Sequence, residues 1–506
     1  MGTGYIRIQA STADEALPVA GADVMIKQRN GNRLFKTRTG EDGKTEDFPL
    51  PTPSAAYTLS PCGNCNGALP YSLCDVDIKA DGFVTKHIRG VQILDTQTTI
   101  LPVNMQPLAE EPNPVREEVV EIPPAGLLLS EEYRKMDPPI ARAAEEVIIP
   151  DYITVHLGRP DNASARNVRV KFPEYVKNTA SSEIYATWPE ESLRANIHAI
   201  TTFALNRVYT EWYPARGYNF DITNSTSYDQ YFRYEGPIFE SISRITDEIF
   251  NVYAHRFGFR NPFFTQYCNG TTVTCPGMSQ WGTVTLANQG MEALEILHYY
   301  YPQDLQLTMS DNITGITESF PGEPLNLGST GESVRRVQND LNRIRINYPL
   351  IPAIPNPNGV FDSETQSAVI TFQRVFNINA NGIVNRATWN RIASIFVAVT
   401  RLAELDGEGI RYTIGINPPD ITLSQGSRGE YVQELQFILT VISVFYPSVP
   451  PVIIDGVFGS VDKNAVMEFQ KTFGLPQTGV VNAEVWNKLY TVYRGIKNNV
   501  PVPEEG

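Results

Sequence analysis

A long internal repeat near the C-terminus constrains the fold of this chain more than any other sequence feature. The run that begins at Gly328 recurs from Gly426, and the segment from Asn358 to Trp389 recurs from Asp455 to Trp486. Nearly constant offsets between copies indicate a duplicated domain. In each copy the apolar positions fit three short helices, with an Asn-Gly or Asp-Gly turn between the first two. The predicted domains are residues 326–398 and 423–495.

The repeated motifs resemble the peptidoglycan-binding type 1 domain. Both copies contain Gly-x-x-Gly-x-x-Val-x-x-x-Gln-x-x-Leu, and the second contains Asp455-Gly-Val-Phe-Gly459. The first copy departs from this pattern, with Asn358 and Asp362 at the corresponding positions. The resemblance implies two small three-helix domains that bind peptidoglycan.

Short strands are predicted in residues 1–106. Apolar and polar positions alternate there with a period of two between turn signals such as Gly40-Glu-Asp-Gly43, which is typical of a small β-sandwich. The segment resembles the carboxypeptidase regulatory-like, prealbumin-type fold, and that resemblance implies a domain without catalytic residues. The predicted strands include Tyr5–Gln9, Ala22–Lys27, Ala56–Leu59 and Val76–Lys79.

Residues 107–150 are rich in glutamate and proline, as in Glu110-Glu-Pro-Asn-Pro114. A segment of this composition cannot bury a core, so we expect an extended and accessible linker. Composition alone leaves two interpretations open, a passive tether and a site of proteolytic cleavage.

A buried helix is predicted to begin at Pro189. Proline suits the first helical turn, and Glu190 and Glu191 place negative charge at the positive end of the helix dipole. Apolar residues then recur at helical spacing, which predicts an inward-facing side. These residues are Leu193, Ile197, Ile200, Ala204 and Val208.

Glu183 lies just ahead of this helix, in a segment flanked by Ile184, Tyr185 and Trp188. A carboxyl group among apolar side chains loses solvation of its charged form, so its pKa rises and it can donate a proton near neutral pH. A solvated loop carboxylate is the alternative interpretation, because isolated glutamates are mostly exposed.

The run from Glu183 to Ala195 resembles the glutamate-bearing motif of the stage II sporulation protein D family of lytic transglycosylases. The longer run through Phe220 resembles the clostridial spore cortex-lytic enzymes. The resemblance implies a mixed α+β catalytic domain over residues 151–312, with Glu183 as its catalytic residue and no cofactor. It also implies a spore location, in the cortex or at the boundary of coat and cortex.

The run from Gly277 to Gly282 resembles the glycine-rich Gly-Met-Ser-Gln-Tyr-Gly loop of the same family, which lies close to the active glutamate. Ser279 and Gln280 are therefore candidates to hydrogen-bond sugar hydroxyls, and Trp281 is a candidate to stack on a sugar or to belong to the core. Tyr231 is a further candidate for substrate binding. The Gly-His-Gly that precedes this loop in the family is replaced here by Thr-Cys-Pro.

The cortex-lytic enzymes are described as zymogens whose N-terminal part is removed by a subtilisin-like germination protease. The resemblance thus implies an activating protease as a partner and a processing site near residues 146–149. The whole sequence predicts a multidomain chain: a prealbumin-like β-sandwich, a linker, an α+β catalytic domain and two three-helix domains.

Five cysteines are too few for a disulfide scaffold. Cys62, Cys65 and Cys74 lack a nearby fourth ligand for structural zinc. Cys268 and Cys275 flank an apparent tight hairpin and either form a disulfide or pack as free thiols.

The chain has 41 basic and 56 acidic residues and a formal charge of −15. Such a charge disfavours nucleic acid and anionic lipid as partners, whereas a polysaccharide surface is compatible. The N-terminus lacks the apolar core of a signal peptide, and no run approaches the roughly 18 apolar residues of a membrane span, so we expect neither segment.

The leading hypothesis is a lytic transglycosylase that acts on spore-cortex peptidoglycan. The alternative is a non-catalytic peptidoglycan-binding protein of the wall or spore. A metal-dependent peptidase or amidase is a third hypothesis, but the five histidines show no His-x-x-Glu-His or comparable pattern.

Overall fold

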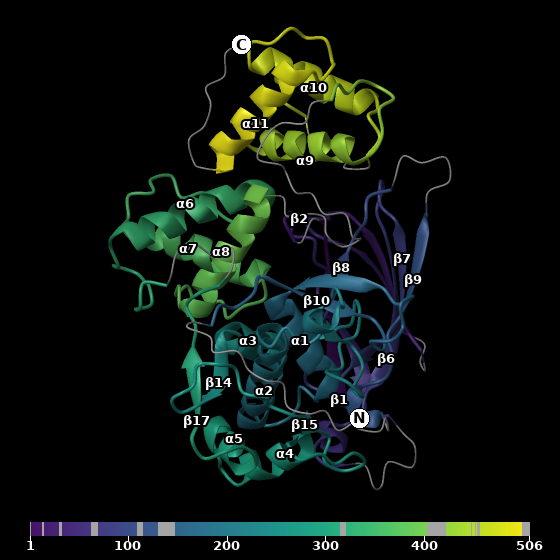
Figure 1. Cartoon of the computed structure of the whole chain (residues 1–506), viewed down its shortest axis with the longest axis vertical. Coiled ribbons are helices and arrows are strands. Elements are labelled where there is room, and N and C mark those ends of the chain that lie inside the picture. The colour runs from purple at the N-terminus through teal and green to yellow at the C-terminus, as the bar shows by residue number, and fades with distance from the viewer. Residues whose placement is uncertain are drawn as a thin grey trace.

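A computed structural model describes residues 2–12, 15–29, 33–61, 69–108, 115–129, 147–313, 320–401, 421–446, 448–450, 452 and 456–497. A β-sandwich lies beside a helical body, and two three-helix units follow along the long axis of the molecule (Figure 1). This confirms the prediction of a multidomain chain that combines sheets and helices. No helix within the described residues is both long and apolar enough to cross a membrane.

Two five-stranded sheets form the sandwich around one apolar core. One sheet has the order β13-β8-β1-β2 with β5 also paired to β1, and the other has the order β4-β3-β6-β7-β9. Side chains alternate along β1, so Ile6 and Ile8 are fully buried whereas Tyr5 is exposed. The strands are β1 (Gly2–Thr12), β2 (Leu17–Pro18), β3 (Asp23–Gln28), β4 (Leu34–Arg38), β5 (Phe48–Thr52), β6 (Ser72–Lys79), β7 (Thr85–Ile93), β8 (Thr98–Asn104), β9 (Glu117–Glu121) and β13 (Ile238–Phe239), with helix η1 (Ala55–Thr58) after β5.

Two of these strands come from outside residues 1–106. β9 belongs to the expected linker and pairs in parallel with β7, and β13 belongs to the helical body and pairs antiparallel with β8. The prediction of an accessible linker is therefore wrong for residues 115–129, which contain β9 and then η2 (Gly126–Leu128). Ile122 and Leu127 are buried. The composition of the segment is mostly polar, but a few buried apolar residues are sufficient to anchor it.

Helix α2 lies at the centre of the helical body and is buried on almost every side. It begins after Pro189 and ends at Tyr209, which confirms the predicted helix. The other helices are α1 (Phe172–Glu183), α3 (Glu240–Ile249), α4 (Gln280–Asn288), α5 (Ala293–Tyr300) and the short η3 (Pro214–Arg216). The strands are β10 (Tyr152–His156), β11 (Asn167–Lys171), β12 (Ile222–Thr223), β14 (Val252–Arg256), β15 (Tyr267–Cys268), β16 (Met278–Ser279) and β17 (Leu305–Met309).

The amphipathic segment from Pro237 to Phe257, which fits one helix by its periodicity, forms three elements instead. Helix α3 occupies only its middle, with β13 before it and β14 after it. The helix ends because Asn251 turns the chain and donates its side-chain amide to the carbonyl of Ser310 (2.8 Å), and β14 then pairs with β17. Pairing with a distant strand overrides the local helical pattern.

Each C-terminal repeat contains three helices, as the sequence predicts. In the first repeat the motif glutamine Gln338 accepts the backbone N–H of Gly359 (2.9 Å) and donates to the carbonyl of Val360 (2.9 Å). Gln436 holds the Asp-Gly turn of the second repeat in the same way. These glutamines are buried parts of the scaffold. The helices are α6 (Glu332–Asn347), α7 (Ser363–Val375), α8 (Arg386–Arg401), α9 (Glu430–Phe445), α10 (Ser460–Thr472) and α11 (Ala483–Lys497).

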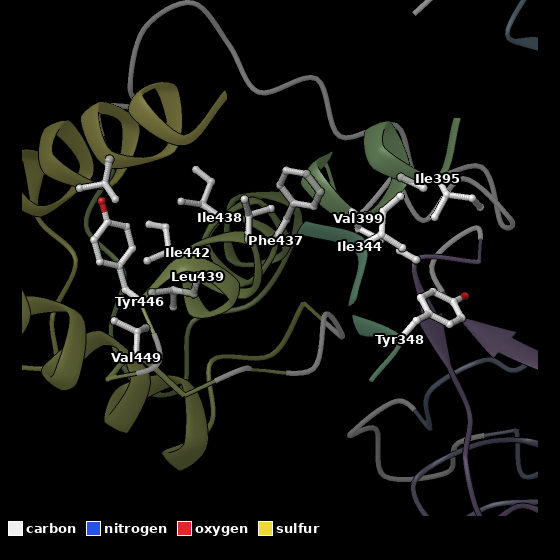
Figure 2. Packing of buried hydrophobic residues seen from close by; sticks show 14 of the residues in the cluster. Ile344, Tyr348, Ile395, Val399, Phe437, Ile438, Leu439, Ile442, Tyr446 and Val449 are labelled. Atoms are coloured by element: carbon white, nitrogen blue, oxygen red, sulfur yellow. The ribbon is translucent and has the colours of Figure 1, made fainter. Parts of the chain in front are cut away.

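The two repeats share one apolar cluster rather than two separate cores. Figure 2 shows Phe437 of α9 directed toward Val399 of α8 and Ile344 of α6. Since all three side chains are at least 97% buried, the contact fixes the second repeat against the first.

A buried ionic cluster joins the sandwich, the helical body and the first repeat. Arg391 of α8 contacts the carboxylates of Glu15 (3.1 Å) and Glu174 (3.5 Å). Lys177 of α1 in turn binds Glu174 (3.0 Å) and Asp247 (2.8 Å). Burial alone would raise the pKa of Glu174, but the charges of Lys177 and Arg391 lower it to about 2.

We expect Arg391→Met to lower the free energy of unfolding by about 3–5 kcal/mol, because the carboxylates of Glu15 and Glu174 lose their shared cation. In the wild-type protein the depressed pKa of Glu174 stabilises the folded state above about pH 4.3, and this contribution is lost as the pH falls toward 2. Urea unfolding at pH 7 and across this range measures both effects. Arg335→Met is the matched control, since its pair with Glu332 on α6 is exposed and should contribute less than about 1 kcal/mol. Equal losses in the two variants would contradict the role assigned to the buried cluster.

Candidate active site

Glu183 is the last residue of α1 and lies at the bend between α1 and α2. Glu183 was predicted to lie in a short segment ahead of α2, and α1 was not predicted. The signal was present, because Pro173 stands in the first turn of α1 and Phe172, Val176 and Ala180 share one buried face. The bend to α2 is enclosed by aromatic side chains, with Trp188 packed on Trp281 at a ring separation of 5.0 Å. Glu183 itself is only 5% exposed.

Three hydrogen-bond donors converge on the Glu183 carboxyl group. The backbone N–H of Tyr231 donates to Oε1 (2.6 Å), the Gln280 side-chain amide donates to Oε2 (3.0 Å), and the Tyr267 hydroxyl is the third donor. Burial raises the pKa of Glu183 to about 7, although each donor acts in the opposite direction. The negative end of the α1 dipole also favours the protonated form. Glu183 can therefore hold a proton near neutral pH and remain stable as an anion after it donates that proton.

A small cavity of about 70 Å³ opens beside Glu183. It is lined by residues of the loops around it: Gly126, Leu129, Glu183, Thr226, Asp229, Tyr267, Cys268, Asn269, Val273 and Gln280. A water molecule takes about 30 Å³ of liquid volume, so this space holds about two waters. Sites for larger ligands usually measure about 300–1,000 Å³, so the cavity is too small for a glycan strand in this state.

The glycine-rich loop explains why Gln280 reaches Glu183. A Cβ atom on Gly277 would lie 1.9 Å from the carbonyl oxygen of Gln266, so only glycine lets β16 approach β15. Ser279 then caps α4 by accepting the backbone N–H of Gly282 (3.0 Å), and Gln280 begins the helix. Cys268 and Cys275 form a disulfide across the loop, which joins two short parallel strands rather than a hairpin.

The predicted site residues thus separate into two groups. Gln280 contacts Glu183 through its side chain, and Tyr231 contacts it through its backbone. Ser279 acts as a helix cap, and Trp281 is 92% buried against Trp188, so this tryptophan lies in the core rather than on a sugar-binding surface. No sequence motif points to Tyr267, which lines the same cavity as Glu183.

Residues 122–129, here termed the lid segment, cover the site from the side of the sandwich. The Tyr231 hydroxyl donates to the carbonyl of Pro124 (3.1 Å), and the backbone N–H of Ala125 donates to the Tyr71 hydroxyl (3.4 Å). A Cβ atom on Gly126 would lie 3.5 Å from the Cα of Glu183. Leu127 is buried in the core of the helical body. The lid segment therefore fills space directly in front of the catalytic candidate.

Three other carboxylates of the helical body, those of Asp221, Asp229 and Asp247, already have hydrogen-bond or ion-pair partners. Asp229 lines the cavity, but it accepts hydrogen bonds from Arg207 (2.7 Å) and from the Tyr213 hydroxyl (2.5 Å). Asp221 accepts the backbone N–H of Thr154 (2.8 Å), and Asp247 belongs to the ionic cluster. Only Asp229 shares the cavity with Glu183, and both of its oxygens accept hydrogen bonds from neighbours.

No group of three or more histidine, cysteine, aspartate or glutamate residues within the described part of the chain is arranged to hold a metal ion. Burial lowers the pKa of His198 to about 4, so this residue of α2 is neutral. Cys74 is a buried thiol outside any disulfide, whereas Cys62 and Cys65 lie outside the described residues.

Comparison with known proteins identifies the C-terminal repeats. The family described as a putative peptidoglycan binding domain matches residues 330–392 and 428–489, within the two three-helix units. The chain therefore carries two peptidoglycan-binding domains, and peptidoglycan is the partner that they indicate.

Two curated proteins are similar to this chain. The N-acetylmuramoyl-L-alanine amidase CwlL of Bacillus licheniformis is 24% identical over 354 residues, which cover 68% of this chain and 93% of the amidase. The zinc D-Ala-D-Ala carboxypeptidase of Streptomyces albus G is 40% identical over 70 residues, which cover 14% of this chain and 26% of the carboxypeptidase. No solved structure matches significantly.

We expect Glu183→Gln to change the pH dependence of stability. The folded protein keeps the Glu183 proton up to about pH 7, whereas an unfolded chain releases it near pH 4.3. The free energy of unfolding of the wild-type protein should therefore fall as the pH rises between these values. The variant lacks this titration and should be more stable than the wild type by up to about 3 kcal/mol at pH 8, with little difference at pH 4.

Urea unfolding of both proteins from pH 4 to pH 8 measures this difference. Glu364→Gln on the exposed surface of α7 is the control, and its curve should parallel the wild-type curve. Parallel curves for Glu183→Gln as well would mean that Glu183 titrates as an ordinary solvated carboxyl group.

Proposed function

We propose that this protein is a peptidoglycan lytic transglycosylase in which Glu183 is the catalytic residue. The observation that carries the proposal is the state of this carboxyl group, which is almost dry, held by three donors and raised in pKa to about 7. The resemblance of its flanking sequence to the sporulation family supports the same chemistry. The names of both relatives concern peptidoglycan, which supports a cell-wall substrate.

The proposed reaction cleaves the bond between N-acetylmuramic acid and N-acetylglucosamine. Protonated Glu183 gives its proton to the glycosidic oxygen as the bond from that oxygen to the muramic C1 breaks. The Glu183 carboxylate then takes the proton of the muramic 6-hydroxyl while that oxygen bonds to C1. The acid is regenerated, no water is consumed and the product is a 1,6-anhydro sugar.

One carboxyl group is sufficient for this route because the attacking hydroxyl belongs to the same sugar and is present at high effective concentration. Glycoside hydrolysis by the usual routes needs a second carboxyl group placed across the scissile bond. Asp229 is the residue nearest to that description, but its oxygens are taken up by Arg207, Tyr213 and Thr223. The occupied state of Asp229 favours transglycosylation over hydrolysis.

The two C-terminal domains serve in this proposal as anchors to insoluble wall. Because they share one apolar cluster, they would present their binding surfaces as a fixed pair. Anchoring raises the local concentration of glycan near Glu183 without taking part in the chemistry. The resemblance to cortex-lytic enzymes makes the cortex of a germinating spore the proposed substrate and location.

Two other functions remain as alternatives to be tested. The similarity to CwlL over 68% of the chain favours an amidase that cuts the bond between muramic acid and L-alanine. A non-catalytic wall or spore structural protein would retain the binding domains without activity. The three functions predict different products from the same peptidoglycan.

We expect digestion of cortex fragments to yield anhydromuramic ends, and we expect Glu183→Gln to abolish that product because an amide cannot donate the catalytic proton. Mass spectrometry detects the anhydro end because the fragment is one water lighter than the product of hydrolysis at the same bond. Borohydride does not reduce this end. Glu364→Gln should retain wild-type activity. Reducible muramic ends would assign the protein to the hydrolases, and free L-alanine amino groups on uncut glycan would assign it to the amidases. Peptidoglycan with neither change would leave a binding protein.

We also propose that the full-length chain is a zymogen. The lid segment leaves a cavity of only about 70 Å³ at Glu183, and the chain upstream of it is anchored in the sandwich through β9. Val147 and Ile149 are buried on the helical body, and the backbone N–H of Ile149 donates to the carbonyl of Asn312, so the proposed processing site near residues 146–149 adjoins an anchored segment. A cut by a subtilisin-like protease in this region would separate the lid segment from the catalytic body in the chain.

We expect Leu127→Asp to raise lytic activity of the full-length chain by roughly tenfold or more, because a carboxylate placed at this buried position costs several kcal/mol and displaces the lid segment. Leu128→Asp is the matched control, since Leu128 is 42% exposed on the same turn. Release of soluble muropeptides from cortex fragments measures the activity. Equal activity of the intact wild-type chain and of a form starting at Val147 would refute the zymogen proposal, as would equal effects of the two substitutions.

A further inference from the structure

Tyr267 occupies an unusual position, because its hydroxyl lies between Glu183 and a fully buried amide. The Gln230 side-chain nitrogen donates to the Tyr267 hydroxyl oxygen (2.9 Å) and to the carbonyl of Ile200 (3.1 Å). The Gln230 side-chain oxygen accepts the hydroxyl of Tyr175 (2.9 Å). Gln230 and Tyr175 are both 0% exposed, so water does not compete for these contacts.

The direction of the hydrogen bonds in this chain is fixed by its members. The carbonyl of Ile200 can only accept, so the Gln230 nitrogen must face both Ile200 and Tyr267. The Tyr267 oxygen therefore accepts one hydrogen bond, from Gln230, and the hydroxyl proton is available for donation to another group. Tyr267 and Glu183 line the same small cavity, and the hydroxyl of Tyr267 favours the charged form of the Glu183 carboxyl group and so lowers its pKa.

We propose that Tyr267 is a positioning residue for Glu183, aimed by Gln230 so that its hydroxyl donates specifically to the carboxylate left after proton transfer. This inference rests on the proposed role of Glu183. It explains how a carboxyl group dry enough to serve as an acid can also persist as an anion and act as a base. The two other donors on Glu183 are a backbone N–H and an amide, and only the tyrosine hydroxyl is oriented by a buried side-chain relay.

A hydrogen bond from the Tyr267 hydroxyl lowers the pKa of Glu183. Hydrogen bonds to an anion lower its pKa, and bonds to charged groups are stronger than bonds between neutral groups. Tyr267 thus offsets part of the rise in pKa that burial causes. Removal of the hydroxyl should stabilise the protonated form relative to the anion and slow the second step of the reaction, in which Glu183 must be the base.

Tyr267→Phe tests the inference in the full-length chain, because it removes one oxygen atom and keeps the ring. In the wild type, the free energy of unfolding falls with rising pH until Glu183 has lost its proton, near pH 7. In Tyr267→Phe this end point should lie about one pH unit higher. Tyr175→Phe is the matched control, since it deletes a buried hydroxyl on the other side of Gln230, whose amide nitrogen the carbonyl of Ile200 still holds toward Tyr267. It should lower stability without moving this end point.

Activity gives a second readout on the chain opened by Leu127→Asp. With Tyr267→Phe added, the basic limb of the pH–rate profile should shift upward by about one unit, and the maximal rate should fall about tenfold. The same addition of Tyr175→Phe should leave the basic limb in place. If Tyr267→Phe leaves unchanged the pH range over which the free energy of unfolding falls, the inference is overturned, whether or not the protein cuts glycan. A shifted pH range in a protein without lytic products would instead overturn the proposed function and leave the role of Tyr267 standing.

Discussion

Desolvation of the Glu183 carboxyl group is the constraint on which the arrangement of the helical body depends. The group sits at a bend between two helices, beside which aromatic side chains pack, and the lid segment lies against the backbone of Glu183. A buried carboxyl group without partners would be costly, and the three donors limit that cost without cancelling it. The glycine-rich loop, the turn at Tyr231 and strand β15 are each placed so that one donor reaches this carboxyl group.

The elements that the sequence predicts well are those with local signals. Pro189 and two glutamates predict the start of helix α2, and the internal repeat predicts the C-terminal helices. Strand β9 is short and polar, and β13 continues directly into the helical pattern of α3. Neither strand can be recognised before its pairing partner is known. Tyr267 escaped notice for the same reason, because its role depends on Gln230 from a separate loop. Glu183 was found through its motif, whereas its burial depends on segments distant in sequence.

The structure also separates what a motif says about fold from what it says about function. The repeated glutamines of the C-terminal domains hold turns, and Trp281 of the glycine-rich loop packs in the core. A motif that recurs because it builds a scaffold identifies the domain reliably but does not identify the atoms that touch a ligand. In the glycine-rich loop, only Gln280 among the three candidates extends its side chain to the carboxyl group of Glu183.

The sandwich and the helical body share a sheet, because β13 of the body completes the edge next to β8. A break in the chain between residues 129 and 147 removes covalent continuity but leaves this pairing and the contact of Arg391 with Glu15 intact. The two pieces would form a non-covalent complex, and its lifetime rather than the cut itself would determine when glycan reaches Glu183. After separation, the discarded sandwich would expose the unpaired backbone of β8, an edge that can accept a strand from another copy. A sandwich released in this way would therefore be prone to self-association.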